Sequence, residues 1–354
     1  MYDFFLEYGL FLLKAITVVV SIVIVVGIVA SSRSQSQSSG RGNLQVRKMN
    51  DQFDQYRDTL REAVMTGSAL KEHHKAEKKR KKTEKKAEKK QQATRKSDDP
   101  AQRRRVFVLD FDGDIKASAV DHLREAVSGV LTMARSEDEV VVRLESAGGM
   151  VHSYGLASSQ LLRIRQKELP LTICVDKVAA SGGYMMACVA NHIVAAPFAI
   201  LGSIGVVAQI PNFHRVLKKH DIDFELITAG EHKRTLTMFG ENTDKGREKF
   251  REDIEDTHGL FKDFVQENRP AVPIDAVATG EVWFGSKALE QQLIDKIATS
   301  DEYLMNACED ADVYEVRFVE KKGLQERLGI SIQTAFERVV GRLIEADRLK
   351  RFLG

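Results

Sequence analysis

The strongest constraint on the fold is a series of short apolar runs rich in β-branched residues, each followed by a stretch with helical spacing. They read VFVLDF, VVVRLES, LTICVD and HIVAAP, at residues 106–111, 140–146, 171–176 and 192–197. Continuous apolar runs are typical of parallel strands that helices cover on both faces. The pattern therefore predicts an α/β fold with a mainly parallel sheet.

The segments between and after these runs predict the helices. They are 119–134, 153–168, a helix that starts near Ser181, 212–220 and the long 244–268. FELITAG, at 224–230, predicts one more strand. The apolar stretch 184–210 is long enough for a membrane span, but it contains Asn191, His192 and Pro197 and strand-like pieces, so we interpret it as core.

Two further segments have apolar residues at steps of three and four, which predicts amphipathic helices. One covers 46–64 and is expected to pack on the body of the protein or on a neighbouring subunit. The other runs from Leu324 to Leu343 in the C-terminal extension. For this second helix, packing or oligomerisation is the simple interpretation, and contact with a membrane surface is the alternative.

Residues 8–30, YGLFLLKAITVVVSIVIVVGIVA, carry a single charge, that of Lys14. A helix of this length can cross the roughly 30 Å apolar core of a bilayer. A cleaved signal peptide would begin with basic residues and have a shorter apolar core, whereas Asp3 and Glu7 come first here. We therefore expect residues 1–30 to form a retained transmembrane anchor. The basic residues that follow predict that the body faces the cytoplasm.

A Ser/Gly/Gln linker at 31–42 is followed, after the helix at 46–64, by a basic run at 71–96 with 13 Lys or Arg and four Glu. Such a run is usually a solvated segment without fixed structure, and less often it binds anionic lipid. Because no aromatic residue is interleaved with it, the run does not predict nucleic-acid binding.

The three cysteines, Cys174, Cys188 and Cys308, form no C-x-x-C pair, so a disulfide framework is not expected. Cys174 and Cys188 lie in apolar stretches typical of a core. No set of His, Cys, Asp and Glu has the spacing of metal ligands, so no metal site is predicted.

Small residues gather directly after three of the predicted strands. Gly148 and Gly149 follow the second strand, Ser181 follows the third, and Ser203 follows the fourth. Ligand sites in parallel sheets collect at the carboxyl ends of the strands. A corner such as Ala-Ser-Gly-Gly is often only a tight turn, but this placement also makes Ser181 a candidate nucleophile.

A serine hydroxyl becomes a strong nucleophile only when a base takes its proton. The chain has nine histidines, and none has an acidic partner at a recognisable spacing. A lysine can serve instead if burial lowers its pKa from about 10.4. Lys233 follows the predicted strand at 224–230 and precedes apolar residues. Taken alone, a lysine in this position is more typical of a surface.

Four segments carry a resemblance to a known family. VDKVAASGGYMMACVAN, APFAILGSIGVV, GEHKRTLTMFGENT and ATGEVWFGSKALEQQLIDKIATSDE occur in this order, at 175–191, 196–207, 230–243 and 278–302. Together they resemble the signal peptide peptidase family of Ser-Lys serine proteases over about 106–305. The resemblance implies a fold similar to the caseinolytic protease and crotonase group, a spiral of ββα repeats, and a reaction without metal or cofactor.

The resemblance also implies the roles of individual residues. Ser181 matches the nucleophile and Lys233 the general base, while Ser203 matches the hydroxyl that orients the lysine. The backbone N–H groups of Gly148 or Gly149, together with that of Gly182, match the oxyanion hole.

Two positions depart from the family's pattern. Ala147 stands where a proline precedes the glycines, and Gln292 stands where a glycine is common. Both departures keep the chemistry of the proposed site.

The implied protein is a membrane-anchored endopeptidase that cleaves unstructured or signal-peptide-like peptides through an acyl-enzyme. The expected organisation is an anchor at 1–30, a linker region at 31–105, a peptidase domain at 106–305 and an extension at 306–354. Two alternatives stay open: a crotonase-type enzyme acting on coenzyme A thioesters, and a non-catalytic membrane scaffold.

The resemblance further implies the bacterial inner membrane. Family members often act on its outer side, whereas the charges here favour the cytoplasmic side, so the side that the catalytic domain faces stays open. Rings are common in the family, so a homo-oligomer could complete the site between subunits.

Overall fold

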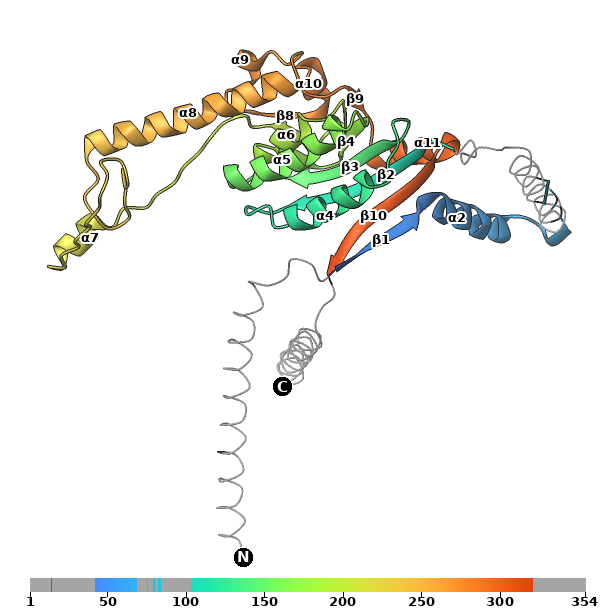
Figure 1. Cartoon of the computed structure of the whole chain (residues 1–354), viewed down its shortest axis with the longest axis horizontal. Coiled ribbons are helices and arrows are strands. Elements are labelled where there is room, and N and C mark those ends of the chain that lie inside the picture. Colours follow the sequence, from blue (N-terminus) through green and yellow to red (C-terminus); the bar gives the residue numbers. More distant parts are fainter. Residues whose placement is uncertain are drawn as a thin grey trace, which may run out of the picture. The chain divides into compact units, whose positions relative to one another are not determined.

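The computed structural model describes residues 14, 42–68, 75, 79, 82, 83 and 103–320 (Figure 1). The predicted anchor at 8–30 apart from Lys14, most of the basic run at 71–96 and the predicted helix at 324–343 lie outside these residues. Among the helices that are described, none is both long enough and apolar enough to cross a membrane.

Ten strands of the described ranges form one mixed sheet. Its main path is β1-β10-β2-β3-β4-β6-β9. These strands are β1 (Gly42–Lys48), β10 (Asp312–Glu320), β2 (Arg105–Gly113), β3 (Glu139–Ser146), β4 (Leu171–Val175), β6 (His192–Ala195) and β9 (Lys296–Ile297). Every pair from β10 to β9 along this path is parallel. The predicted α/β fold with a mainly parallel sheet is confirmed, and the four apolar runs are β2, β3, β4 and β6.

Neighbouring side chains of each strand point to opposite faces of the sheet. Because the apolar strands therefore present apolar residues on both faces, helices cover both. Phe107 and Leu109 of β2 belong to the larger apolar core, with α4 (Val120–Leu131) and α5 (Val151–Gln166). Val106 and Val108 belong to a second core, with α11 (Ser300–Asp310) and the start of α2 (Met49–Val64). The larger core also contains residues of four other helices: α6 (Gly182–Ala187), α8 (Asp244–Asn268), α9 (Ile274–Val277) and α10 (Gly285–Glu290).

The sheet branches at the carboxyl end of β3. The first part of β3 pairs with β4, whereas its last residue, Ser146, pairs with Ala179 of β5 (Val178–Ala180). β5 pairs in parallel with β7 (Ile200–Gly202), and β7 pairs in antiparallel fashion with β8 (Val282–Phe284). The branch therefore brings the corners after β3, β5 and β7 to one place.

Residues 207–243, which we call the arm, form most of the connection between β7 and α8. Figure 1 shows α7 (His214–Lys219) on this arm, well apart from α6 and the sheet. Nearly every residue from 207 to 234 is exposed. The predicted strand at 224–230 is wrong, because this segment is irregular and pairs with no described strand.

The sheet extends beyond both expected boundaries of the peptidase domain. β1 lies inside the region predicted as linker, and β10 lies beyond residue 305. The predicted helix at 46–64 packs on the body only through its first turns, where Met49 is buried and Asn50 donates to the carbonyl oxygens of Cys308 and Ala311 at 3.1 and 2.9 Å. Tyr56, Leu60 and Val64 are exposed.

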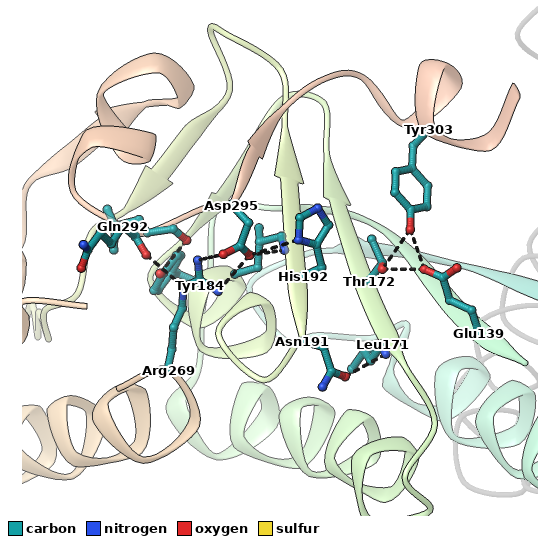
Figure 2. A network of polar contacts seen from close by, with 12 residues as sticks. Glu139, Leu171, Thr172, Tyr184, Asn191, His192, Arg269, Gln292, Asp295 and Tyr303 are labelled. Carbon is teal, nitrogen blue, oxygen red and sulfur yellow. Dashed lines mark hydrogen bonds and ion pairs between the residues drawn. The ribbon is translucent and has the colours of Figure 1, made fainter. Parts of the chain in front are cut away.

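A polar network joins the end of α8 to the sheet (Figure 2). Arg269 donates to the carboxylate of Asp295 at 2.8 and 3.1 Å and to the carbonyl oxygen of Gln292 at 3.0 Å. Asp295 also accepts from the backbone N–H of Ile193 in β6 at 2.7 Å. The φ angle of Gln292 is +60°, which is the conformation that favours the glycine common at this position.

Candidate active site

Ser181 forms the corner between β5 and α6. Its φ and ψ angles are +52° and −120°, a conformation that is strained for any residue with a Cβ. The corner is held on both sides, since the Ser181 N–H donates to the Gly202 carbonyl oxygen at 2.8 Å and the Ser181 carbonyl oxygen accepts from Met185 at 2.9 Å. Ser181 is half-buried, so solvent still reaches it. Strain of this kind, maintained by the surrounding structure, is typical of functional sites.

Gly148 lies directly against this corner. A methyl group on Gly148 would sit 2.7 Å from the Cβ of Ser181 and 2.8 Å from the backbone nitrogen of Gly182. Gly148 also has a φ of +91°, which glycine adopts without strain. The turn after β3 and the corner after β5 are therefore in contact, as the predicted site requires.

The backbone N–H groups of this contact differ in their partners. The Gly148 N–H donates to the Oγ of Ser146 at 3.1 Å. Among the described residues, the N–H groups of Gly149 and Gly182 have no hydrogen-bond acceptor. Gly182 begins α6, where the first amides have no partner within the helix. Gly149 and Gly182 are therefore the better pair of donors for an oxyanion, and Gly148 supports the turn.

Ser203 occupies the equivalent corner of the neighbouring strand. Ala180 and Gly202 are partners in the β5–β7 pairing, so Ser181 and Ser203 leave adjacent strands in register. Ser203 also has a positive φ, +50°, and its N–H donates to the Glu281 carbonyl oxygen at 2.6 Å. The structure thus places both predicted serines at one edge of the sheet.

The structure does not bring Lys233 to this edge. Lys233 lies on the arm, where it is exposed and its backbone N–H closes a turn with Gly230 at 3.2 Å. Among the described residues, none forms a hydrogen bond with the hydroxyl of Ser181. His258 of α8 bonds the backbone beside Ser203, with Nε2 3.2 Å from the Ile204 carbonyl oxygen. Within the described residues, the corner therefore presents the candidate nucleophile without a hydrogen-bonded base.

Sequence reasoning missed two residues beside the site, Ser146 and Tyr154. Both are buried, and their hydroxyl oxygens lie 2.5 Å apart directly behind the Gly148 turn. Burial raises the pKa of the Tyr154 phenol. In the sequence, Tyr154 is indistinguishable from other core residues of α5. The position of Ser146 at the end of a strand, just before the glycines, was the available signal.

The chain matches two family models that together span most of its length. Residues 3–161 match the description "Peptidase family S49 N-terminal", and residues 163–314 match "Peptidase family S49". The probable protease SohB of Haemophilus influenzae is 48% identical over 340 residues, covering 96% of each chain. The probable protease SohB of Buchnera aphidicola subsp. Schlechtendalia chinensis is 46% identical over 86% of this chain and 99% of that protein. A solved membrane-bound stomatin-specific protease matches 60% of this chain and 97% of its own, at 13% identity and a TM-score of 0.40.

Proposed function

The chain is a SohB-like member of peptidase family S49, and from that premise we propose that it is a membrane-anchored endopeptidase with Ser181 as nucleophile and Lys233 as general base. The observation that carries the proposal is the strained Ser181 corner with Gly148 packed against it. A serine at such a corner has little bulk around it, since Gly148, Gly182 and Ala180 are its neighbours. A substrate carbonyl could therefore approach the hydroxyl closely.

The reaction would proceed through an acyl-enzyme. Attack by the Ser181 hydroxyl on the peptide carbonyl develops a negative charge on the carbonyl oxygen. The N–H groups of Gly149 and Gly182 would stabilise this charge, and Gly182 adds the positive end of the α6 amides. Ser203, at the adjacent corner, would hold the base in position.

The base would come from a second copy of the chain. Lys233 is exposed on the arm, and Figure 1 shows that this part of the chain stands apart from α6. The arm is also rich in exposed apolar side chains, which in a soluble monomer rarely gather in such number. They include Val207, Ile210, Phe213, Val216, Ile222, Phe224, Leu226, Ile227, Met238 and Phe239. Docking of this arm beside the Ser181 corner of a neighbour would bury the apolar residues and surround the lysine with the apolar pocket that a lysine base requires.

The substrates would be unstructured or membrane-derived peptides. The two SohB relatives described above are named as probable proteases, and the predicted anchor at 8–30 would hold the chain in the bacterial inner membrane. Small apolar side chains would suit shallow pockets beside the small residues of the corner. Hydrolysis of a peptide library without any bias towards such side chains would contradict this preference.

The decisive experiment uses the full chain in detergent and an unfolded protein substrate. Ser181→Ala and Lys233→Ala should each lower hydrolysis by roughly 10³-fold or more. Co-expression of the two variants should restore about a quarter of the wild-type activity, because random assembly pairs an intact serine with an intact lysine at that share of interfaces. Co-expression of Lys233→Ala with the doubly substituted chain is the control, and it should restore nothing.

Each other outcome corrects a different part of the proposal. If wild type is active but the mixture is not, Lys233 acts within its own chain. If Lys233→Ala stays active while Ser181→Ala is inactive, a histidine is the base. If wild type hydrolyses no peptide and instead binds a coenzyme A thioester, the chain is a crotonase-type enzyme.

A further inference from the structure

A chain of three hydrogen bonds runs from the Gly148 turn to the loop after β2. The Gly148 N–H donates to Ser146 Oγ at 3.1 Å, the hydroxyl oxygens of Ser146 and Tyr154 lie 2.5 Å apart, and the Tyr154 hydroxyl donates to the Asp114 carbonyl oxygen at 2.8 Å. A hydroxyl has one proton to donate. Since Tyr154 gives its proton to Asp114, Ser146 gives its own to Tyr154 and accepts from Gly148. The alternative acceptor for Ser146, the Gly113 carbonyl oxygen, is more distant at 3.4 Å.

The two side chains in the middle of this series of hydrogen bonds are closed to solvent. Ser146 is 2% exposed and Tyr154 is fully buried. An unpaired polar group in such a place is costly, so every donor in the chain keeps its acceptor. The raised pKa of the Tyr154 phenol, which follows from its burial, keeps the phenol in the form that donates.

The ring of Tyr154 reaches the other half of the candidate oxyanion hole. A methyl group on Gly182 would lie 2.4 Å from Cγ of this ring, so the backbone of Gly182 rests directly on it. One side chain therefore contacts Gly182 directly and reaches the Gly148 turn through Ser146. The ring supports Gly182, and the hydroxyl, acting through Ser146, holds the turn of Gly148.

We propose that Tyr154 and Ser146 are positioning residues that set the separation of the two oxyanion donors. This inference rests on the proposed function, because it assigns a task within the same site. Ser146 engages the amide of Gly148, and the next amide, that of Gly149, stays free for the substrate oxygen. Tyr154 fixes this turn relative to Gly182. Neither side chain touches the substrate.

The test compares Tyr154→Phe and Ser146→Ala in the full chain. Loss of a complete oxyanion donor costs about 10²–10³-fold in rate, so a misplaced donor should lower kcat by about tenfold with KM unchanged. A peptide aldehyde, which forms a tetrahedral adduct with the serine, should bind more weakly by the same factor. Because both residues act through one chain of bonds, the double variant should be no worse than either single variant.

Tyr303→Phe is the matched control. Tyr303 donates to Glu139 at 2.6 Å, at the start of the strand that Ser146 ends (Figure 2). The Tyr303→Phe substitution removes a phenol hydroxyl at the opposite end of β3 and should leave kcat unchanged. An equal loss of kcat in Tyr303→Phe, or wild-type kcat in Tyr154→Phe, would overturn the proposal.

A second measurement is independent of activity. Hydrogen exchange of the Gly148 amide should become at least tenfold faster in Tyr154→Phe and in Ser146→Ala but not in Tyr303→Phe, because exchange requires the amide to leave its acceptor. Unchanged exchange in both variants would refute the positioning role. The Gly148 amide could exchange as expected while neither wild type nor any variant hydrolyses peptides. In that case the positioning role stands and the proposed function fails.

Discussion

The backbone N–H of Ser181 donates a hydrogen bond to the carbonyl oxygen of Gly202, at 2.8 Å. This bond continues the β5–β7 pairing by one residue. Directly after it, both strands end in a serine with a positive φ. Ser181 and Ser203 are therefore parts of one rigid edge. The peptide unit between Gly202 and Ser203 thus links the two corners through one hydrogen bond.

The first prediction concerns the contact of Gly148 with Ser181. In Gly148→Ala, the new methyl group would lie 2.7 Å from the Ser181 Cβ, so we expect kcat to fall by about 10²-fold or more as the oxyanion donors separate. Gly155→Ala is the control, since Gly155 lies in α5 with open space around it. It should keep wild-type kcat and raise the free energy of unfolding by about 0.5–1 kcal/mol. Wild-type kcat in Gly148→Ala would show that the contact has no catalytic importance.

The second prediction separates the hydroxyl of Ser203 from its backbone strain. Ser203→Ala keeps the strained φ of +50° and removes the hydroxyl, whereas Ser203→Gly removes both. If the hydroxyl orients the base, both variants should lose about tenfold or more of kcat, and Ser203→Gly should be the more stable in thermal unfolding. Full activity in Ser203→Ala would exclude the orienting role.

The third prediction tests whether the arm docks on a second copy. Ile227 is 92% exposed, so Ile227→Ser should leave the stability of a single chain nearly unchanged. If the arm docks, this variant should assemble more weakly, as measured by light scattering in detergent, and should lose activity in parallel. Met133→Ser changes an exposed apolar residue on the body, and it should have neither effect. Equal assembly of Ile227→Ser and wild type would place the interface elsewhere.

The fourth prediction concerns pH and the carboxylate of Asp295. Burial alone would raise the pKa of Asp295, but the hydrogen bonds from Arg269 and Ile193 outweigh burial and leave the pKa below its ordinary value. A lowered pKa in the folded state stabilises the fold above the pKa of the unfolded chain, about 3.9, and this contribution is lost as the pH falls. Asp295→Asn should therefore cost roughly 1–3 kcal/mol of unfolding free energy at pH 7.

The matching measurement is denaturation of Asp295→Asn and wild type at several pH values. The difference between them should shrink as the pH falls below about 4. If the difference in unfolding free energy between the two proteins stays constant from pH 7 down to pH 3, the negative charge of Asp295 does not contribute to stability.

The parts of the site that depend on local chain geometry could be predicted from the sequence. Gly148 follows β3, which is evident from its apolar run. Ser181 and Ser203 follow β5 and β7, two three-residue strands that the sequence did not predict, and their pairing beside β3 brings these corners together. Lys233 is different, because its position depends on a long arm that makes few contacts with its own chain. Short-range patterns carry no information about where such a segment goes, and the predicted strand at 224–230 failed for the same reason.

Other elements were missed because their signal is distributed over distant parts of the chain. β10 carries Glu315 and Arg317 among its apolar residues, and Arg143 of β3 pairs with Glu315 at 2.7 Å. The charged residue Glu315 of β10 is therefore paired by a residue more than 170 positions away in the sequence, which local patterns do not reveal. Tyr154 has the spacing of an ordinary core residue in α5, and only the folded chain shows its hydroxyl behind the glycine turn.

If Lys233 serves the Ser181 of a second copy in the membrane, as proposed, the separation of the two residues has a consequence for a newly made molecule. An enzyme whose two halves of a dyad sit on different chains is inert while it is dilute. While few copies are assembled, the rate of hydrolysis would rise with the square of the number of copies per membrane area. Once most copies are assembled, it would rise in proportion to that number. Synthesis, insertion and diffusion of a lone copy would thus be safe for its neighbours, and the membrane itself, by gathering copies in two dimensions, would act as the switch.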